Sequence, residues 1–496
     1  MNLLGYDLGS SSVKASIMDV ETGECIASAF HPKEEMKIDA PEKEWAEQHP
    51  ETWWQSIVAA TRELMQNPAV KKETISAVGI SYQMHGLVVL GKDHEVLRPS
   101  IIWCDSRAVK IGDKAFDQIG GEKCLASLLN SPGNFTASKL RWVKENEPAV
   151  YDQIDKIMLP GDYIAFRMTG DIQTTPSGLS EGIFWDFKEH DVSSLIMDHF
   201  GFDKSFVPTI VSNIGVQSHI HAQAAKELGI PAGIPVAYRA GDQPNNALSL
   251  NVLNPGEIAA TAGTSGVVFG VSDQIKYDPL SRVNTFAHVN HTRENSRLGV
   301  LLCVNGTGST NAWLKRNVAG ENMSYDDMNK LAGQIPVGAD GLKILPFGNG
   351  AERIMRNKDT GCVVEGLNFN RHTKSHFMRA AHEGIVFAFQ YGMSIMHETG
   401  IDPAVIRAGH ANMFLSPVFR ESLAAITQTG IELYNTDGSQ GAARAAGVGA
   451  GIYKSFGEAF SGLKVIKTIQ PDPSIQKPLL DAYNDWKSLL EEKIKE

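Results

Sequence analysis

The chain has 496 residues, of which 42% are hydrophobic and 21% are charged, a composition typical of globular proteins. This length exceeds what one hydrophobic core supports and predicts two or three domains. The net charge of −11, without runs of lysine or arginine, argues against a nucleic-acid partner. The five cysteines are scattered, which excludes a disulfide framework or a zinc site.

No apolar stretch approaches the length that spans a membrane, and the N-terminus leads directly into a predicted strand. We therefore expect no membrane partner and no signal peptide. A cytoplasmic location follows as the expectation.

Residues 3–19 predict a strand, a tight turn and a second strand. Asp7 stands at the end of the first strand, the turn holds Gly9, Ser10 and Ser11, and Lys14 follows. Small residues let backbone N–H groups approach an anion, and hydroxyls add donors. A carboxylate next to a phosphate needs Mg²⁺ between them. The stretch fits nucleoside triphosphate chemistry, although an ordinary hairpin that opens a sheet has the same pattern.

Residues 261–273 repeat this pattern, with Gly263 placed 254 positions after Gly9 (263 − 9). A gapless alignment pairs Ser10 with Thr264, Ser11 with Ser265 and Val13 with Val267. Two such hairpins, one opening each half, predict a duplicated lobe. Facing each other across a cleft, they would hold a polyphosphate from both sides. A chance match of small and apolar residues is the alternative.

The apolar run 77–81 predicts a buried strand that delivers Gln83, Met84 and His85 to a loop ending at Gly86. Open α/β sheets place ligand groups at the ends of such strands. A lone histidine is just as often structural, so both readings of His85 stay open here.

If residues 101–107 are extended, Trp103, Asp105 and Arg107 share one face. A flat apolar ring beside an acid and a base suits a polyhydroxylated ligand. The structural alternative is an Asp–Arg pair on an edge strand with a core tryptophan.

At the midpoint of the chain, a predicted strand over 236–238 delivers Gly241 and Asp242, and a helix is expected to begin near Asn245. Pro244 fits the first helical turn, where its missing N–H is not needed. Asp242 would then lie at a helix N-terminus, which favours its ionised form. An aspartate that caps the helix is compatible with a catalytic one.

Predicted strands and helices alternate in the second half of the chain as they do in the first. Residues 303–314 pass from a strand through a glycine-rich loop into a helix. A strand over 404–408 enters a turn at Gly409, and the next helix begins with Ser416 as its N-cap. Such a strand–turn–helix suits the flat face of an adenine.

The chain resembles the FGGY carbohydrate kinases from end to end, through motifs that occur in the family's order. The motifs are Asp7-x-Gly9-Ser10-Ser11-Ser12-x-Lys14, Trp45-x-Glu47-Gln48-x-Pro50, Gln83-Met84-His85-Gly86, Trp103-x-Asp105-x-Arg107, Gly241-Asp242, Gly263-Thr264-Ser265-Gly266 and the Gly409 turn. The resemblance implies ATP-dependent phosphorylation of a ketose, with D-xylulose as the first candidate, and ATP and Mg²⁺ as cofactors.

The resemblance also implies an α/β fold of two duplicated actin-like (ribonuclease H-like) ATPase lobes around a central cleft. Residues 1–247 would form the N-terminal lobe, which binds the sugar and carries the catalytic aspartate. Residues 248–496 would form the C-terminal, nucleotide-binding lobe. The substrate would be a small-molecule sugar, and a homodimer is left open.

By resemblance, Asp242 is the base for the sugar hydroxyl, Asp7 belongs to the Mg²⁺–phosphate region, and both are metal-ligand candidates. The sugar-binding candidates are Gln83, Met84, His85, Trp103, Asp105, Arg107, Asp242 and Gln243. The nucleotide-binding candidates are Gly9, Ser10, Ser11, Lys14, Gly263, Thr264, Ser265, Gly308, Gly409 and Asn412.

Three positions depart from the pattern of the most similar family members. Gln243 replaces their usual asparagine, Tyr82 replaces a glycine, and residues 408–410 read Ala-Gly-His rather than a run of glycines. The first two departures leave open another ketose or polyol, such as ribulose, fuculose or glycerol. A different class with the same lobes, an ATP-driven chaperone or scaffold, needs neither the Gly–Asp pair nor the Trp/Asp/Arg segment.

Overall fold

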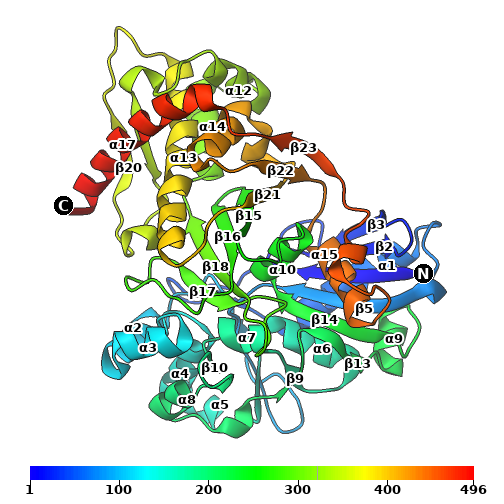
Figure 1. The fold of residues 1–496 in the computed structure, drawn as a ribbon. Helices are drawn as coiled ribbons and strands as arrows, with labels where there is room; N and C mark the ends of the chain where they lie inside the picture. The colour runs from blue at the N-terminus through cyan, green and yellow to red at the C-terminus, as the bar shows by residue number, and fades with distance from the viewer. Residues whose placement is uncertain (321, 496) are drawn as a thin grey trace. The chain divides into compact units, whose positions relative to one another are not determined.

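The computed structural model describes residues 1–320 and 322–495, which form two compact units, each with its own β-sheet (Figure 1). Unit 1 comprises residues 1–251, 286–298 and 436–463. Unit 2 comprises the described residues of 252–285, 299–435 and 464–496.

The main sheet of unit 1 has the strand order β13-β14-β5-β1-β2-β3. Its strands are β1 (Asn2–Leu8), β2 (Val13–Asp19), β3 (Cys25–His31), β5 (Ile75–Tyr82), β13 (Ile214–His219) and β14 (Pro235–Gly241). The central strands β1, β5 and β14 run parallel, whereas the outer neighbours pair antiparallel. Because parallel strands end at one edge, the residues that follow β1, β5 and β14 come together there.

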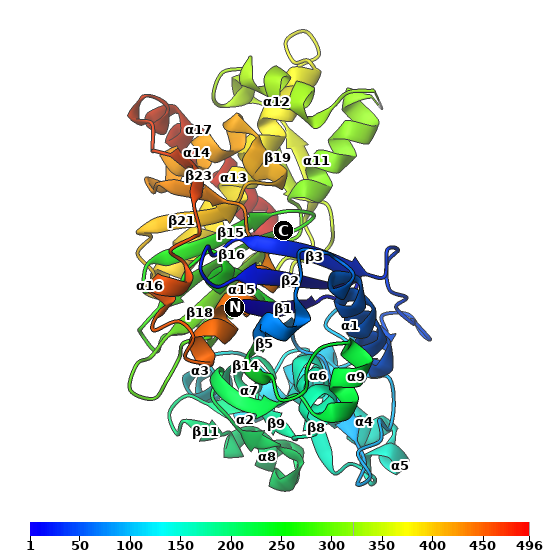
Figure 2. The same cartoon turned by 90° about the vertical axis from the view of Figure 1, so that its right-hand side faces the viewer.

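Helices cover both faces of this sheet. On one face, Tyr6 of β1 shares a hydrogen bond of 2.6 Å with Thr61 of α1 (Pro50–Met65). On the other, Ser16 of β2 contacts Ser439 of α15 (Gly438–Gly449) at 2.7 Å between hydroxyls. Figure 2 shows α1 and α15 on opposite sides of β1 and β2. The alanines and glycines of α15 permit this helix to pack closely on β1 and β5.

The other elements of unit 1 are short. The helices are α2 (Val109–Ile119), α3 (Gly121–Leu128), α4 (Thr136–Asn146), α5 (Pro148–Tyr151), α6 (Pro160–Thr169), α7 (Pro176–Glu181), α8 (Ser194–Phe200), α9 (Ala222–Leu228), α10 (Asp242–Ser249) and α16 (Phe456–Ala459). Four two-stranded pairs are β4 (Glu47–Gln48) with β7 (Ser100–Ile101), β6 (Val88–Leu90) with β8 (Lys156–Met158), β9 (Gln173–Thr174) with β12 (Thr209–Ile210), and β10 (Trp185–Asp186) with β11 (Asp191–Val192).

The sheet of unit 2 has the order β17-β18-β16-β15-β21-β22-β23. Its strands are β15 (Glu257–Ala262), β16 (Gly266–Ser272), β17 (Asn284–Ala287), β18 (Leu298–Val304), β21 (Val405–Gly409), β22 (Ile431–Tyr434) and β23 (Val465–Ile469), and a separate pair joins β19 (Lys343–Phe347) to β20 (Gly361–Glu365). The helices are α11 (Gly308–Leu314), α12 (Tyr325–Gly333), α13 (Lys374–Glu398), α14 (Pro417–Thr427) and α17 (Pro473–Lys495). The core lies between the sheet and α13, α14 and α17.

The two units repeat one topology, which confirms the expected α/β fold with duplicated lobes. In each, an antiparallel hairpin (β1–β2 or β15–β16) is followed by parallel neighbours (β5 and β14, or β21 and β22). The gapless alignment is wrong after the turn, because Leu8 pairs with Val13 whereas Ala262 pairs with Gly266. The second turn is therefore one residue shorter, and Val13 corresponds to Gly266.

The two compact units do not divide the chain at one point, because residues 436–463, with α15, belong to unit 1. The division into family domains at 1–247 and 248–496 stays a prediction. Within the described residues, no helix is long and apolar enough to cross a membrane.

Candidate active site

Two carboxylates lie at the strand ends of unit 1. Asp7 is near the end of β1, and its Oδ1 accepts a hydrogen bond of 2.8 Å from the Ser81 hydroxyl of β5. Asp242 directly follows β14 and is the first residue of α10, with Pro244 in the first turn as expected. The helix begins at Asp242, three residues before the expected start. The parallel register of β1, β5 and β14 explains why two residues so far apart in sequence meet.

The electrostatics of this pair differ from the expectation. Burial, and then the charge of Asp7, raise the pKa of Asp242 to about 7, against hydrogen bonds from Gln243 that lower it. Burial likewise raises the pKa of Asp7, and the hydrogen bond from Ser81 offsets part of this effect. A helix N-terminus stabilises a carboxylate by only about 0.3–1 kcal/mol. Desolvation beside a second acid outweighs it. The helix N-terminus therefore favours the ionised form of Asp242 as expected, but burial and Asp7 set the direction of the pKa shift.

This pair fits a magnesium nucleotide rather than a metal held by protein alone. Among the described residues, no three or more His, Cys, Asp or Glu side chains lie close enough together to hold a metal ion. Mg²⁺ is commonly held by one or two carboxylates together with substrate phosphates and water. Two acids that repel each other and have raised pKa values gain from a cation placed between them.

The raised pKa predicts that the contribution of Asp242 to the stability of the ligand-free protein falls as pH rises from about 4 to about 7. Folded Asp242 keeps its proton up to about pH 7, whereas an unfolded aspartate releases it near ~3.9. Unfolding therefore releases a proton in this window, so the free energy of unfolding falls with rising pH. The rise of the pKa from ~3.9 to about 7 corresponds to about 4 kcal/mol, and solvent screening of the partly exposed side chain reduces it by about half. Asp242→Asn cannot ionise and should therefore be more stable than wild type by about 2 kcal/mol above pH ~7.

Denaturant unfolding of both proteins at about pH 5 and about pH 8 measures this difference. The advantage of Asp242→Asn should grow with pH. A difference that stays constant would show that Asp242 titrates normally in the folded protein.

The start of α15 closes the site around Asp7. Asp437 caps this helix and forms an ion pair of 2.7 Å with Lys14 of β2, so the structure places the expected nucleotide lysine against this carboxylate. A Cβ added to Gly438 would lie 2.3 Å from Asp7 Oδ2 and 3.1 Å from Asn246 Oδ1. Only glycine therefore lets the helix start approach Asp7 this closely.

The loop after β5 brings Met84 and His85 to the same edge. The Met84 side chain packs against Gly241, where an added Cβ would lie 2.5 Å from its Cγ. His85 has a φ of 62°, and its backbone N–H donates to Glu181 Oε2 at 3.1 Å. Its ring Nδ1 lies 3.0 Å from the Glu181 carbonyl oxygen. Lys139 Nζ donates to the His85 carbonyl at 2.8 Å and to the Ile102 carbonyl at 2.9 Å.

Sequence reasoning missed these two residues that hold His85. Glu181 and Lys139 are fully buried, and burial raises the pKa of Glu181 and lowers that of Lys139 to about 7. One signal was available in the sequence. Lys139 lies on the face of a predicted helix that is otherwise apolar, and a lysine at such a position is rarely buried without a partner.

The expectation that Trp103, Asp105 and Arg107 share one face is wrong. Strand β7 ends at Ile101 and a turn follows, so the two-residue period does not apply. Trp103 is 53% exposed, and its Nε1 donates to the Ser10 hydroxyl at 3.3 Å. Asp105 and Arg107 are buried and bind each other, with Arg107 also paired to Glu47 at 2.7 Å. Both are therefore occupied inside the fold.

The remaining sugar candidates differ in exposure. Gln83 is buried, and its Nε2 donates to Gln48 Oε1 at 3.2 Å. Gln243 is partly exposed and hydrogen-bonds the Asp242 carboxylate. In the turn after β1, Gly9 and Ser10 are partly exposed and Ser11 is exposed.

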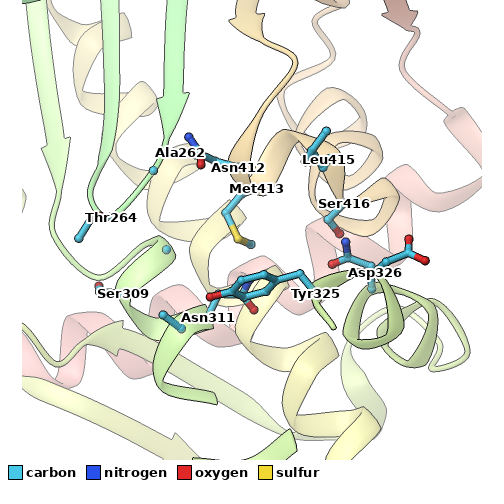
Figure 3. Close-up of a pocket in the computed structure, with 14 residues that line it drawn as sticks. Ala262, Thr264, Ser309, Asn311, Tyr325, Asp326, Asn412, Met413, Leu415 and Ser416 are labelled. Carbon is cyan, nitrogen blue, oxygen red and sulfur yellow. The ribbon is translucent and has the colours of Figure 1, made fainter. Parts of the chain in front are cut away.

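Unit 2 contains a cavity of about 630 Å³ (Figure 3). Four expected nucleotide residues line it: Gly263, Thr264, Gly308 and Asn412. Ser265 and Gly409 are not among its lining residues. The others are Ala262, Ser309, Asn311, Ala312, Tyr325, Asp326, Asn329, Met413, Leu415 and Ser416. This volume lies within the range of sites for small ligands and cofactors.

Two backbone segments meet at one end of this cavity. The Gly308 N–H donates to the Gly263 carbonyl at 2.9 Å, and the Ser309 N–H donates to the Thr264 carbonyl at 3.0 Å. A Cβ on Gly308 would lie 2.2 Å from the Gly263 oxygen, so the start of α11 requires glycine to approach the hairpin turn. Small residues and hydroxyls at this end suit a polyphosphate.

Apolar side chains form the other end. In Figure 3 the Met413 side chain points toward the ring of Tyr325, and Leu415 adds a further apolar surface. Ser416 caps α14 as expected, accepting from the Phe419 N–H at 3.4 Å. Side chains of this kind can cover the faces of a flat heterocycle. Sequence reasoning missed Tyr325, which comes from a segment without a recognisable motif, and Met413, which directly follows the expected nucleotide residue Asn412.

The family models of the N-terminal and C-terminal domains of the FGGY family of carbohydrate kinases match residues 2–249 and 258–450. The chain therefore belongs to the FGGY family of carbohydrate kinases, which confirms the resemblance seen in its motifs.

Its curated relatives include a xylulose kinase of Escherichia coli K12, 30% identical over 475 residues, which cover 95% of this chain and 94% of the relative. A xylulose kinase of Bacillus subtilis 168 is 28% identical over 463 residues, or 92% of this chain and 90% of the relative.

Solved structures share the fold along the whole chain. Xylulose kinase from Rhodospirillum rubrum is 25% identical with a TM-score of 0.90, covering 100% of both chains. Gluconate kinase from Lactobacillus acidophilus is 22% identical with a TM-score of 0.91, covering 99% of this chain and 98% of that one. These likenesses confirm the α/β fold of two duplicated actin-like ATPase lobes.

Proposed function

We propose that this carbohydrate kinase transfers the terminal phosphoryl group of ATP to a ketose, D-xylulose first, giving D-xylulose 5-phosphate. The observation that carries the reaction type is the pair of carboxylates of Asp7 and Asp242, both of intermediate exposure, in which Asp242 begins a helix at the end of a central strand. The choice of D-xylulose is supported by relatives named xylulose kinase, which match nearly the full chain.

Asp242 is proposed to orient the sugar hydroxyl and to accept its proton. Phosphoryl transfer passes through a loose transition state, so positioning and charge neutralisation dominate. A general base works best when its pKa lies near the working pH, because a large fraction of it is then ionised and it still binds a proton well. In the ligand-free protein burial and the charge of Asp7 raise the pKa of Asp242 to about 7, whereas a bound Mg²⁺ would lower it, so orienting the hydroxyl is its main proposed role.

The nucleotide is assigned to the cavity of unit 2. Gly263 and Thr264 would bind phosphate oxygens through backbone N–H groups, and Asn412 would contact the nucleoside. Gly308, whose own N–H donates to the Gly263 carbonyl, would hold the turn in place and let a phosphate approach closely. ATP supplies the phosphoryl group and Mg²⁺ neutralises its charge. Asp7 and Asp242 are proposed to hold the ion, and Gly9, Ser10 and Ser11 to lie on the phosphate side of unit 1.

The sugar is assigned to the loop after β5 and its surroundings. Met84 and His85 would contact the sugar, and the exposed ring of Trp103 would cover its C–H face. We propose that Asp105 and Arg107 support this segment from inside, because each already has an ionic partner.

Gln243 favours a second candidate, a kinase for another ketose or a polyol. It adjoins Asp242 and binds its carboxylate, so it can influence which hydroxyl is accepted. Tyr82 is fully buried and packs against Gly161 of α6, where an added Cβ would lie 2.0 Å from its ring, so it would influence this choice only through neighbouring side chains.

A coupled assay of ADP release with Mg·ATP and a panel of pentuloses, hexuloses and polyols tests the proposal. D-Xylulose should give the highest kcat/KM. A higher value for another ketose or a polyol would support the second candidate. ATP hydrolysis without any sugar dependence would contradict both and favour an ATP-driven scaffold.

A further inference from the structure

Gln48 is a buried residue of β4 with 2% of its surface exposed. Its Nε2 donates to the Ser10 carbonyl at 2.7 Å and to the Lys37 carbonyl at 3.3 Å. Its Oε1 accepts from Trp53 Nε1 at 3.0 Å and from Gln83 Nε2 at 3.2 Å. The side-chain amide thus uses both of its N–H donors and both acceptor positions.

Two of these four partners belong to segments that contact different ligands in the proposed reaction. Ser10 lies in the turn of residues 9–12 on the phosphate side, and Gln83 opens the loop of residues 83–86 on the sugar side. The backbone adds a parallel contact, because the Gln83 N–H donates to the Leu8 carbonyl at 2.7 Å. Gln48 is therefore a single-residue bridge between the two segments.

The antiparallel pairing of β4 with β7 holds the backbone of Gln48 in place. Gln48 pairs with Ser100 in the ladder, and Trp103, just beyond β7, donates to the Ser10 hydroxyl. The turn is thus held both at its backbone and at a side chain. Gln83 is 1% exposed, and among the described residues its Oε1 is buried without a hydrogen-bond partner, so the amide is anchored through Nε2 alone.

We propose that Gln48 is a positioning residue that couples sugar binding at the 83–86 loop to nucleotide binding at the 9–12 turn, an inference that rests on the proposed function. A buried amide with all of its hydrogen bonds made cannot follow a shift of one partner without straining its bond to the other. When the sugar orders the loop of residues 83–86, Gln48 therefore restricts the turn of residues 9–12. The nucleotide then binds more tightly, because less conformational freedom of the turn remains to be lost.

Gln48→Glu and Gln83→Glu separate the two ends of the bridge. Glutamate at position 48 still accepts from Trp53 and Gln83 but has no N–H for the Ser10 carbonyl. Glutamate at position 83 cannot donate to Gln48 Oε1, but the hydrogen bond from Gln48 to the Ser10 carbonyl is kept. Trp53→Phe is the matched control, because it removes a third bond of Gln48 and touches neither ligand segment.

Calorimetric titration of a non-hydrolysable ATP analogue with Mg²⁺, with and without saturating D-xylulose or the best sugar of the panel, measures the coupling. In wild type and Trp53→Phe, the sugar should increase nucleotide affinity by at least about fivefold. In Gln48→Glu and Gln83→Glu, the sugar should increase nucleotide affinity by less than about twofold. The nucleotide affinity measured without sugar should differ from that of wild type by less than about threefold.

Hydrogen exchange of the peptide that contains residues 8–13 gives a second readout without nucleotide. Sugar should slow exchange in wild type and in Trp53→Phe but not in the two glutamate variants. The inference is overturned if wild type shows no coupling, if both glutamate variants retain it, or if Trp53→Phe loses it equally. A wild type that phosphorylates no sugar overturns the proposed function instead.

Discussion

Replacing Asp242 with asparagine should lower kcat by about 10²–10⁴-fold while sugar and Mg·ATP still bind. Asparagine keeps the shape of the side chain and can still orient a hydroxyl, but it cannot accept the proton. The loss therefore measures what the Asp242 carboxylate contributes to turnover, as proton acceptor and as a negative charge beside the Mg²⁺ ion. Initial rates with varied sugar and ATP, together with calorimetric affinities, separate turnover from binding.

Asp203→Asn is a suitable control, because Asp203 is exposed and caps a short 3₁₀ helix of unit 1 away from the carboxylate pair. It should leave kcat within about twofold of wild type. If Asp242→Asn also retained kcat within a few-fold, Asp242 would not be the proton acceptor. If it lost binding of both ligands, it would act in the fold rather than in turnover.

Gly308→Ala should raise the KM for ATP by about tenfold or more, with the KM for sugar measured at saturating ATP nearly unchanged. The added methyl group would lie 2.2 Å from the Gly263 carbonyl oxygen, and the turn of residues 263–265 must then move away from α11. This movement breaks the backbone hydrogen bonds from Gly308 and Ser309 that shape the phosphate end of the cavity.

Gly333→Ala provides the matched control in the same unit. Gly333 is the last residue of α12, and an added Cβ meets no other atom within 4 Å. It should leave both KM values unchanged and, because alanine favours a helix, should not lower stability. Equal effects of the two substitutions on the KM for ATP would contradict the assignment of the nucleotide to this cavity.

The sequence allowed prediction of features that depend on short stretches of chain. Both glycine hairpins and the strand–Gly241–Asp242–helix segment were recognisable because strand ends, turns and helix starts have local residue preferences. The duplication was recognisable from the repeated hairpin, although the single-residue difference in turn length was not, because a turn gains or loses a residue without changing its composition.

Features that depend on distant contacts were not predictable. The orientation of Arg107 is set by Glu47 and by the ring of Trp45, which lies 3.8 Å from the guanidinium carbon. The pKa of Asp242 depends on burial and on Asp7, which outweigh the local effect of the helix. Met413 and Tyr325 belong to separate segments that only the folded unit 2 brings to one cavity.

Phosphorus NMR of the protein with Mg·ATP and D-xylulose tests the central claim most directly. The account predicts that the terminal phosphate resonance of ATP is replaced by that of a sugar phosphomonoester, together with ADP, and that Asp242→Asn slows this conversion by about 10²-fold or more. ATP that stays intact with every ketose and polyol, or that yields inorganic phosphate alone, would contradict it.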